Sequence, residues 1–266
     1  MVAVMKKSGA APLRPSLVLA VFLCAGNARA GEPVRDRWGN IQQVDIQAEP
    51  PVAKAAIAFD FQFSYSNALG LPRPQRELVI YWPTGGRWNG ALFPQCDPVL
   101  LAQQGPEVCP ANSLFLRGKA LAALGSQALT IESEVQGFVG LPKNGNPTQI
   151  FYIRPQIGPA FVLTGEFTEE GQGPYGLVQR FDMNAIPAST ALTPSPIILT
   201  AFHSEDLHTY VTRRVDGTDL QIALTVAPDT CPADGFWHYA IESRYRLGDL
   251  PLRSVGRQPC VGASTD

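Results

Sequence analysis

Residues 57–65 read Ile-Ala-Phe-Asp-Phe-Gln-Phe-Ser-Tyr, and this alternation decides the fold class. Every second side chain from Ile57 to Tyr65 is large and apolar, and the side chains between them are small or polar. Successive side chains of a β-strand point to opposite faces, so a period of two gathers the apolar set on one face. The stretch therefore predicts a half-buried strand.

Similar short runs, each bounded by Gly, Pro or Asn, predict strands along the rest of the chain. They lie at 77–82, 115–124, 128–139, 149–154, 161–167, 177–181, 197–202, 209–215, 220–226, 236–247 and 252–256. Asp216-Gly217 favours a tight hairpin between two of them. A single open sheet of a dozen strands curls or splits, so we expect an all-β fold of the two-sheet β-sandwich kind.

The first thirty residues have the features of an export signal. Basic residues precede an apolar run from Leu17 to Cys24, and Ala28-Arg29-Ala30 supplies a small-x-small cleavage site. We expect a signal peptide over residues 1–30, cleaved near Ala30-Gly31, and a secreted protein that is extracellular or lies at the cell surface. Lipid anchoring through Cys24 is disfavoured, because large apolar residues precede it where a lipobox ends in a small residue.

The mature chain is expected to form one β-sandwich-like domain over residues 56–262, preceded by an extended lead-in over residues 31–55. The Pro-rich stretch 186–196 is the candidate internal boundary. No stretch of the sequence approaches the ~20 apolar residues that a bilayer-spanning helix needs, so we expect no stable membrane insertion.

The charge of the chain argues against nucleic-acid partners. The sequence has 21 basic and 23 acidic side chains, and four of the basic ones but none of the acidic ones lie in residues 1–30. The mature chain then carries a formal charge of −6. Nucleic acids and anionic membranes attract proteins with a basic surface, which this composition does not provide.

Cleavage leaves four cysteines, an even number that predicts two disulfides in an oxidising compartment. They are Cys96, Cys109, Cys231 and Cys260. Three pairings are possible, and we favour nearest neighbours because each such pair brackets a compact local motif. A two-cysteine metal site is the alternative for the first pair, but zinc usually requires a second ligand pair nearby.

The segment between Cys96 and Cys109 predicts the one short helix of the protein. Asp97 is a good N-cap, and Pro98 suits the first helical position because its missing N–H would have no partner there. Gly105 allows the left-handed conformation that ends a helix. A disulfide would hold together a helix that is too short to persist alone.

Around this segment the chain resembles a group of uncharacterised secreted proteins that are common in high-GC Gram-positive bacteria. The shared signature consists of Pro83, Gly85, Asn89, Pro94 and Cys96, then Cys109, Pro110, Ala111, Ser113, Gly118 and Ala120, and a C-terminal Cys231, Gly235-Phe236-Trp237 and Cys260. One departure is Leu116, where a second glycine is expected. The resemblance implies an exported β-rich fold with no known activity.

Three histidines limit the catalytic possibilities. His203 and His208 flank Ser204-Glu205-Asp206-Leu207, and His238 is the third histidine of a conceivable metal site. Their spacing does not place two imidazoles on one helical face, and no His-Glu-x-x-His motif is present. We interpret the cluster as a solvated loop with capping carboxylates.

The sequence also gives little support for other kinds of hydrolytic site. No Gly-x-Ser-x-Gly elbow is found. The acidic pairs Glu132/Glu134 and Glu169/Glu170 are interpreted as surface charge, because glycoside hydrolysis needs carboxylates that face each other across a cleft. We expect no catalytic residue, no metal and no cofactor.

Aromatic residues are the one candidate binding feature. Tyr81, Trp82 and Trp88 flank Thr84-Gly85-Gly86, and an exposed aromatic loop on a rigid β fold can stack on sugar rings or peptides. The alternative is that Trp82 or Trp88 belongs to the core. Trp237 and Tyr239 carry the same ambiguity.

Two functional hypotheses follow. The first is a secreted, non-catalytic binding or structural module of unknown ligand, for which a cell-surface carbohydrate or a protein would be a suitable partner. The alternative is a secreted hydrolase, glycosidase-like or metal-dependent, with a site built from scattered acids and histidines. A deep polar cleft with facing carboxylates would favour the enzyme, and a shallow aromatic surface would favour the binding module.

Overall fold

The computed structural model describes residues 31–124, 129–186, 197–245 and 250–262. The expected signal peptide and residues 187–196 of the expected internal boundary lie outside the described residues. Within the described ranges the protein is predominantly β, with one α-helix. This confirms the all-β prediction.

The secondary-structure elements follow one another as a series of mostly short strands. The strands are β1 (Val34–Arg35), β2 (Asn40–Glu49), β3 (Ala58–Asn67), β4 (Gln75–Pro83), β5 (Arg87–Trp88), β6 (Leu114–Leu124), β7 (Leu129–Lys143), β8 (Asn146–Pro155), β9 (Phe161–Thr168), β10 (Tyr175–Asp182), β11 (Ile197–Asp206), β12 (Tyr210–Val215), β13 (Thr218–Ala223), β14 (Thr225–Val226), β15 (Phe236–Tyr245) and β16 (Leu252–Pro259). The helix is α1 (Pro98–Gln104), and the 3₁₀ turns are η1 (Gly90–Leu92), η2 (Pro106–Val108) and η4 (Met183–Ala185).

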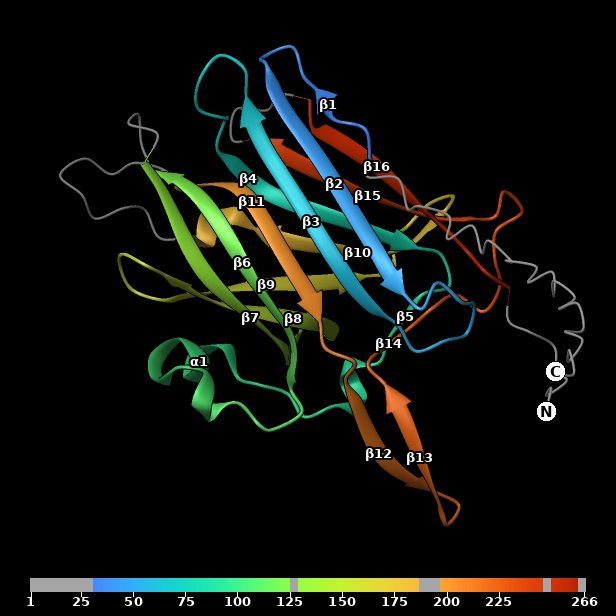
Figure 1. The fold of residues 1–266 in the computed structure, drawn as a ribbon. Coiled ribbons are helices and arrows are strands. Elements are labelled where there is room, and N and C mark those ends of the chain that lie inside the picture. Colours follow the sequence, from blue (N-terminus) through green and yellow to red (C-terminus); the bar gives the residue numbers. More distant parts are fainter. Residues whose placement is uncertain (1–30, 125–128, 187–196, 246–249, 263–266) are drawn as a thin grey trace, which may run out of the picture.

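Twelve strands form one antiparallel sheet in the order β1-β2-β3-β11-β6-β7-β8-β9-β10-β4-β15-β16 (Figure 1). The two-sheet sandwich is not confirmed. Alternation in the sequence reports that one face of each strand is buried, but not what covers that face. A twisted sheet of more than about ten strands curls, and here it curls until its own strands cover its inner face.

The two ends of the sheet meet along β2 and β16, where side chains replace the backbone ladder. The amide of Gln258 in β16 bonds both backbone groups of Ala48, accepting from Ala48 N at 2.6 Å and donating to Ala48 O at 2.7 Å. Further along, Gln42 Nε2 donates to Ile241 O at 3.0 Å and to Ser254 Oγ at 3.1 Å. The sheet is therefore nearly closed into a barrel.

Strand β2 lies inside the expected lead-in of residues 31–55, and sequence analysis missed it. Asn40 and Gln42 point inward and are fully buried although they are polar. The apolar alternation of this strand therefore starts only at Val44. Inward polar residues at one end of a strand hide the period on which a sequence-based prediction depends.

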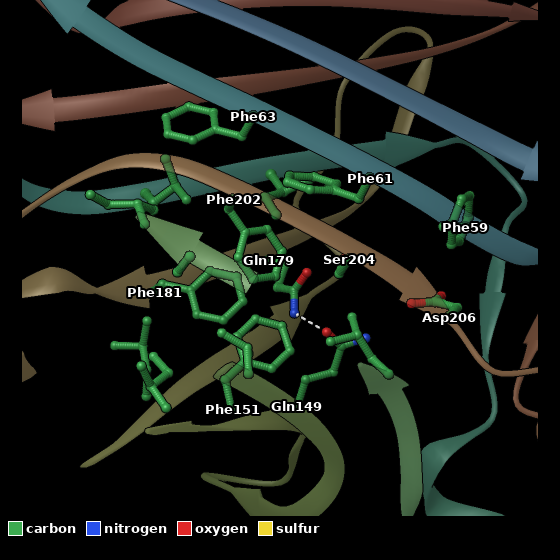
Figure 2. Close-up of a pocket in the computed structure, with 18 of the residues that line it drawn as sticks. Phe59, Phe61, Phe63, Gln149, Phe151, Gln179, Phe181, Phe202, Ser204 and Asp206 are labelled. Atoms are coloured by element: carbon green, nitrogen blue, oxygen red, sulfur yellow. Dashed lines mark hydrogen bonds between the residues drawn. The ribbon is translucent and has the colours of Figure 1, made fainter. Parts of the chain in front are cut away.

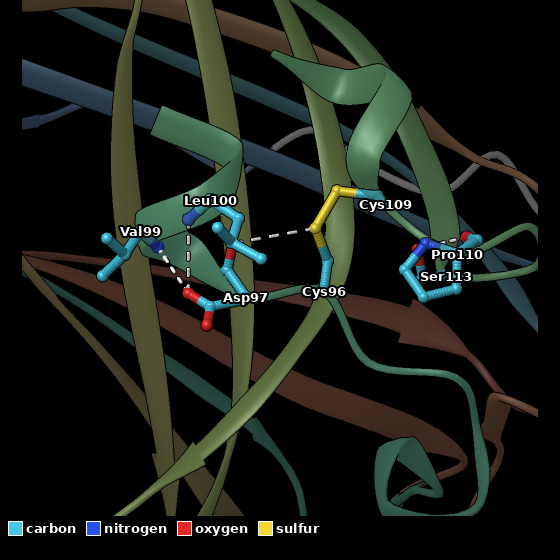
Figure 3. Close-up of a disulfide and its surroundings, with 7 residues drawn as sticks. All are labelled: Cys96, Asp97, Val99, Leu100, Cys109, Pro110 and Ser113. Atoms are coloured by element: carbon cyan, nitrogen blue, oxygen red, sulfur yellow. Dashed lines mark hydrogen bonds between the residues drawn. A yellow bond between two sulfur atoms is a disulfide. The ribbon is translucent and has the colours of Figure 1, made fainter. Parts of the chain in front are cut away.

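The predicted helix and both predicted disulfides are confirmed. Figure 3 shows the Asp97 carboxylate accepting hydrogen bonds from the amides of Val99 at 2.7 Å and Leu100 at 3.3 Å. The Cα atoms are 4.9 Å apart in Cys96–Cys109 and 5.6 Å apart in Cys231–Cys260. The stapled helix covers the outside of the sheet, where buried Leu101 packs with Phe138 and Ile150.

The predicted hairpin at Asp216-Gly217 is present as β12–β13. Both turn residues have positive φ, 50° and 81°, as a tight two-residue hairpin turn requires. The hairpin projects away from the barrel beside the small β5–β14 pair (Figure 1).

Across the described ranges, no helix is both long enough and apolar enough to cross a membrane.

Candidate ligand cavity inside the barrel

The curled sheet encloses a cavity of about 400 Å³. This volume lies within the range of small-molecule sites, which are concave and mostly apolar. Inward side chains from strands on all sides form its wall, and most of them are apolar (Figure 2). The aromatic part of the wall includes Phe59, Phe61, Phe63, Phe151, Phe181 and Phe202.

The two ends of the cavity differ. At one end the β5–β14 pair forms a floor, and the Trp88 ring packs on Phe115 and Phe167 with centroids 5.1 and 5.3 Å away. At the other end the wall reaches Leu129 and Ile157, which are 54% and 68% exposed. Exposed large apolar side chains around an apolar cavity are typical of a ligand entrance.

Three polar side chains of the wall form a hydrogen-bonded chain. Gln179 Nε2 in β10 donates to Gln149 Oε1 in β8 at 2.8 Å, as Figure 2 shows. Trp82 Nε1 in β4 donates to Gln179 Oε1 at 3.2 Å. Gln179 is only 1% exposed, and its hydrogen bonds offset the cost of burying its amide group.

Ser204 and Asp206 bring a second polar group into the cavity from β11. Ser204 is 1% exposed, and its Oγ has no hydrogen-bond partner among the described residues. A buried hydroxyl left without a partner costs about 1–3 kcal/mol. Such a group in a ligand-sized cavity is a candidate contact for a ligand.

Burial raises the pKa of the Asp206 carboxyl to about 8, and a hydrogen bond from the Phe59 amide opposes part of this rise. Asp206 retains some accessible surface, and it lines the cavity. At neutral pH the carboxyl is therefore mostly protonated and can donate a hydrogen bond into the cavity.

The position of Ser204 and Asp206 corrects the sequence interpretation of a solvated loop. Strand β11 continues to Asp206, beyond the predicted end at residue 202. Alternation persists through the segment, so Phe202, Ser204 and Asp206 line the cavity while the residues between them are exposed. That alternation is the signal which could have identified these residues.

The structure does not bring the histidines into one site. His203 Nε2 lies 3.2 Å from an Asp60 oxygen on the outside of the sheet. His238 Nε2 lies 2.7 Å from Asp234 Oδ2, and His208 is an exposed residue after β11. Within the described part of the chain, no group of three or more His, Cys, Asp or Glu side chains is placed to hold a metal.

Three of the four residues in the acidic pairs Glu132/Glu134 and Glu169/Glu170 form ion pairs with basic residues at the surface. The ion pairs are Glu132–Lys119, Glu134–Arg154 and Glu170–Arg180. None of these residues lines the cavity.

The candidate aromatic residues lie on opposite faces of the sheet. Tyr81 is on the outside, 5.6 Å from Tyr175 and under the Arg253 guanidinium, which is 4.4 Å from its ring centroid. Trp82 and Trp88 line the cavity instead. The three rings therefore do not form one exposed platform for a sugar.

The other two aromatic residues, Trp237 and Tyr239, are buried and line the cavity. The Tyr239 hydroxyl accepts a hydrogen bond from Ile46 N at 3.2 Å. These residues therefore join the wall of the cavity to the seam of the barrel.

Comparison with protein families, with curated proteins and with solved structures finds no match for this chain. The resemblance noted in the sequence therefore stays a prediction.

Proposed function

We propose that the protein is an exported, non-catalytic binding protein that holds an apolar small molecule inside its barrel. One observation carries this proposal, namely the apolar cavity of about 400 Å³ enclosed by the sheet. Protein interiors are close-packed and contain few voids larger than a water molecule. A cavity of this size is therefore better explained by a ligand than by packing.

The volume indicates the size of the ligand. An apolar cavity of about 150 Å³ accepts benzene. By proportion, about 400 Å³ holds roughly 16 non-hydrogen atoms. A medium-length alkyl chain or a two-ring or three-ring hydrocarbon is of this size.

Binding is favoured over hydrolysis by the composition of the wall. Among the described lining residues, Asp206 is the single acidic side chain, whereas glycoside hydrolysis uses a pair of carboxyl groups. Export is supported by the features of residues 1–30 and by the two disulfides, which persist in oxidising compartments.

Filling the cavity with a larger side chain tests the proposal. Ala122 in β6 lines the cavity, and its neighbour Leu121 is exposed on the outside of the same strand. N-phenyl-1-naphthylamine, a neutral probe that fluoresces in apolar surroundings, is titrated into the mature protein and into the variants Ala122→Trp and Leu121→Trp.

We expect saturable binding to the wild type, a loss of affinity of about tenfold or more in Ala122→Trp, and little change in Leu121→Trp. Thermal unfolding of each variant verifies that it is folded. Absence of saturable binding to the wild type, or equal binding by both folded variants, would exclude the cavity as the site.

A further inference from the structure

The unpartnered hydroxyl of Ser204 is the starting point for the chemistry of the ligand. The residues opposite Ser204 in the flanking strands are Phe61 in β3 and Gly118 in β6. Neither has a side-chain acceptor. A Cβ at position 118 would lie 2.9 Å from Ser204 Cβ. Glycine at this position therefore lets β6 pair closely with β11 at Ser204. The hydroxyl is therefore left for a group that enters the cavity.

On the side of the cavity, the residues around Asp206 are also apolar. Its opposite residues are Phe59 in β3, as the register of the neighbouring pairs places it, and Leu116 in β6. The charged neighbours Glu205, Asp60 and Arg117 belong to the outside of the sheet. His208 is exposed and, together with Asp206, borders a separate small pocket, but it does not line the cavity itself. Within the described ranges no ion pair involves Asp206.

Among the described residues that line the cavity, Arg87, at the floor beside β14, is the one basic side chain. Its guanidinium lies 3.2 Å from an Asp229 oxygen, and both side chains are more than half exposed. Arg87 is thus already neutralised at the surface. Among the described residues that line the cavity, none near Ser204 and Asp206 offers a positive charge to a buried anion, and burying an unpaired charge is very unfavourable.

Ser204 and Asp206 can bind one ligand atom together. They are two residues apart on the same face of β11, so their Cα atoms are about 6.6 Å apart. This separation is about twice the length of a hydrogen bond. One oxygen atom between the two side chains can therefore contact both, and a hydroxyl and a protonated carboxyl both donate.

We propose that the ligand is an uncharged amphiphile whose carbonyl or hydroxyl oxygen binds between Ser204 and Asp206, with its hydrocarbon part among the surrounding phenylalanine rings. This inference rests on the proposed binding function and specifies the chemistry of the same site. It separates the protein from carriers of fatty-acid anions and of amines.

The test is a competition experiment at pH 7 with the N-phenyl-1-naphthylamine probe. The competitors are 2-undecanone, undecane, decanoate and decylamine, which share a chain of similar length and differ in the polar group. We expect decanoate to bind about tenfold or more weakly than 2-undecanone, because it carries a negative charge into a site without a counter-charge. We also expect decylamine to bind more weakly, because its ammonium group must be desolvated and Asp206 must lose its proton in the apolar wall to pair with it.

Variants of Ser204 and Asp206 test whether these two residues bind the ketone oxygen. Ser204→Ala and Asp206→Leu should each lower the affinity for 2-undecanone by roughly three- to tenfold and leave undecane unchanged, because each removes one hydrogen bond. Asp206→Asn keeps a donor and should retain binding of the ketone. His203→Ala, on the outside of the same strand, is the matched control and should change neither ligand.

The outcomes separate this inference from the proposed function. If no competitor displaces the probe, undecane included, the proposed binding function fails. If undecane binds but decanoate or decylamine is as good as 2-undecanone, or if both variants weaken undecane and the ketone equally, the polar site is refuted and the apolar cavity remains.

Discussion

At position 206 a carboxyl group lies at the wall of an apolar cavity, although its neighbours along the chain are exposed. The alternation of β11 turns it inward, and burial then disfavours its charge. The pKa is raised from an ordinary 3.8 to about 8. The protonation of this one side chain in the cavity wall therefore affects the stability of the fold.

This coupling predicts a pH dependence of stability. Between pH 4 and pH 8 the folded protein keeps the Asp206 proton and the unfolded chain does not. The Asp206 contribution to the free energy of unfolding should therefore fall as pH rises through this window, by up to about 1.4 kcal/mol per pH unit, and level off above it. Urea denaturation at a series of pH values measures the slope.

Asp206→Asn is the comparison for this measurement. The variant lacks the titrating group, so the advantage of the wild type in unfolding free energy over the variant should shrink as pH rises from 4 to 8. Parallel curves for the two proteins would show that the carboxyl has an ordinary pKa.

At the scale of elements, strand β2 completes the barrel through its polar side chains. Gln42 is fully buried at the seam, where it also accepts a hydrogen bond from Ser243 Oγ at 2.5 Å. A bare strand edge exposes unpaired N–H and C=O groups. The glutamine and serine side chains of the seam satisfy such groups without a continuous ladder.

Gln42→Ala should therefore destabilise the protein. The substitution removes the hydrogen bonds that the Gln42 amide makes with Ser243 Oγ, Ser254 Oγ and the Ile241 carbonyl at a buried position, and we expect a loss of roughly 3 kcal/mol in urea denaturation. Gln43→Ala, at the next position of β2 and only partly buried, is the control and should cost less than about 1 kcal/mol. Equal effects at both positions would mean that the seam does not depend on Gln42.

For the whole molecule, the sequence predicts local features well. The strand pattern, the Asp97-capped helix and the Asp216-Gly217 turn follow from residues close to one another in the chain, and both disulfides join cysteines that are nearest neighbours among the four. Each depends on short-range backbone preferences or on an even number of cysteines.

Closure of the sheet and the cavity depend on long-range contacts that alternation does not encode. Gln42 meets Ser254 only after the sheet has curled, and Gln149 meets Gln179 across Gly165 of the strand between them. Inward polar residues also weaken the apolar period, which is why β2 was missed and β11 was predicted too short. The sequence identifies Trp82 and Trp88 as candidate binding residues, but the register of the sheet determines the face on which they lie.

The four tryptophans of the chain can report directly whether a ligand lies inside the barrel. Trp82, Trp88 and Trp237 line the cavity. Trp38 lies outside the cavity wall, 40% exposed, beside the Arg37 and Arg73 guanidinium groups at 4.8 and 4.1 Å. Bromine quenches tryptophan emission at contact, so 1-bromodecane reports where a bound chain lies, and decane is the control without a quencher.

At saturation with 1-bromodecane we predict that the wild type loses emission, and that the variant Trp38→Phe, whose three remaining tryptophans all line the cavity, loses a larger fraction of its emission. Binding to the exterior would give the opposite result. If the substitution Trp38→Phe abolishes the quenching, or if the emission of this variant is unchanged at saturation, the ligand does not enter the barrel. Either result would contradict the proposed binding site.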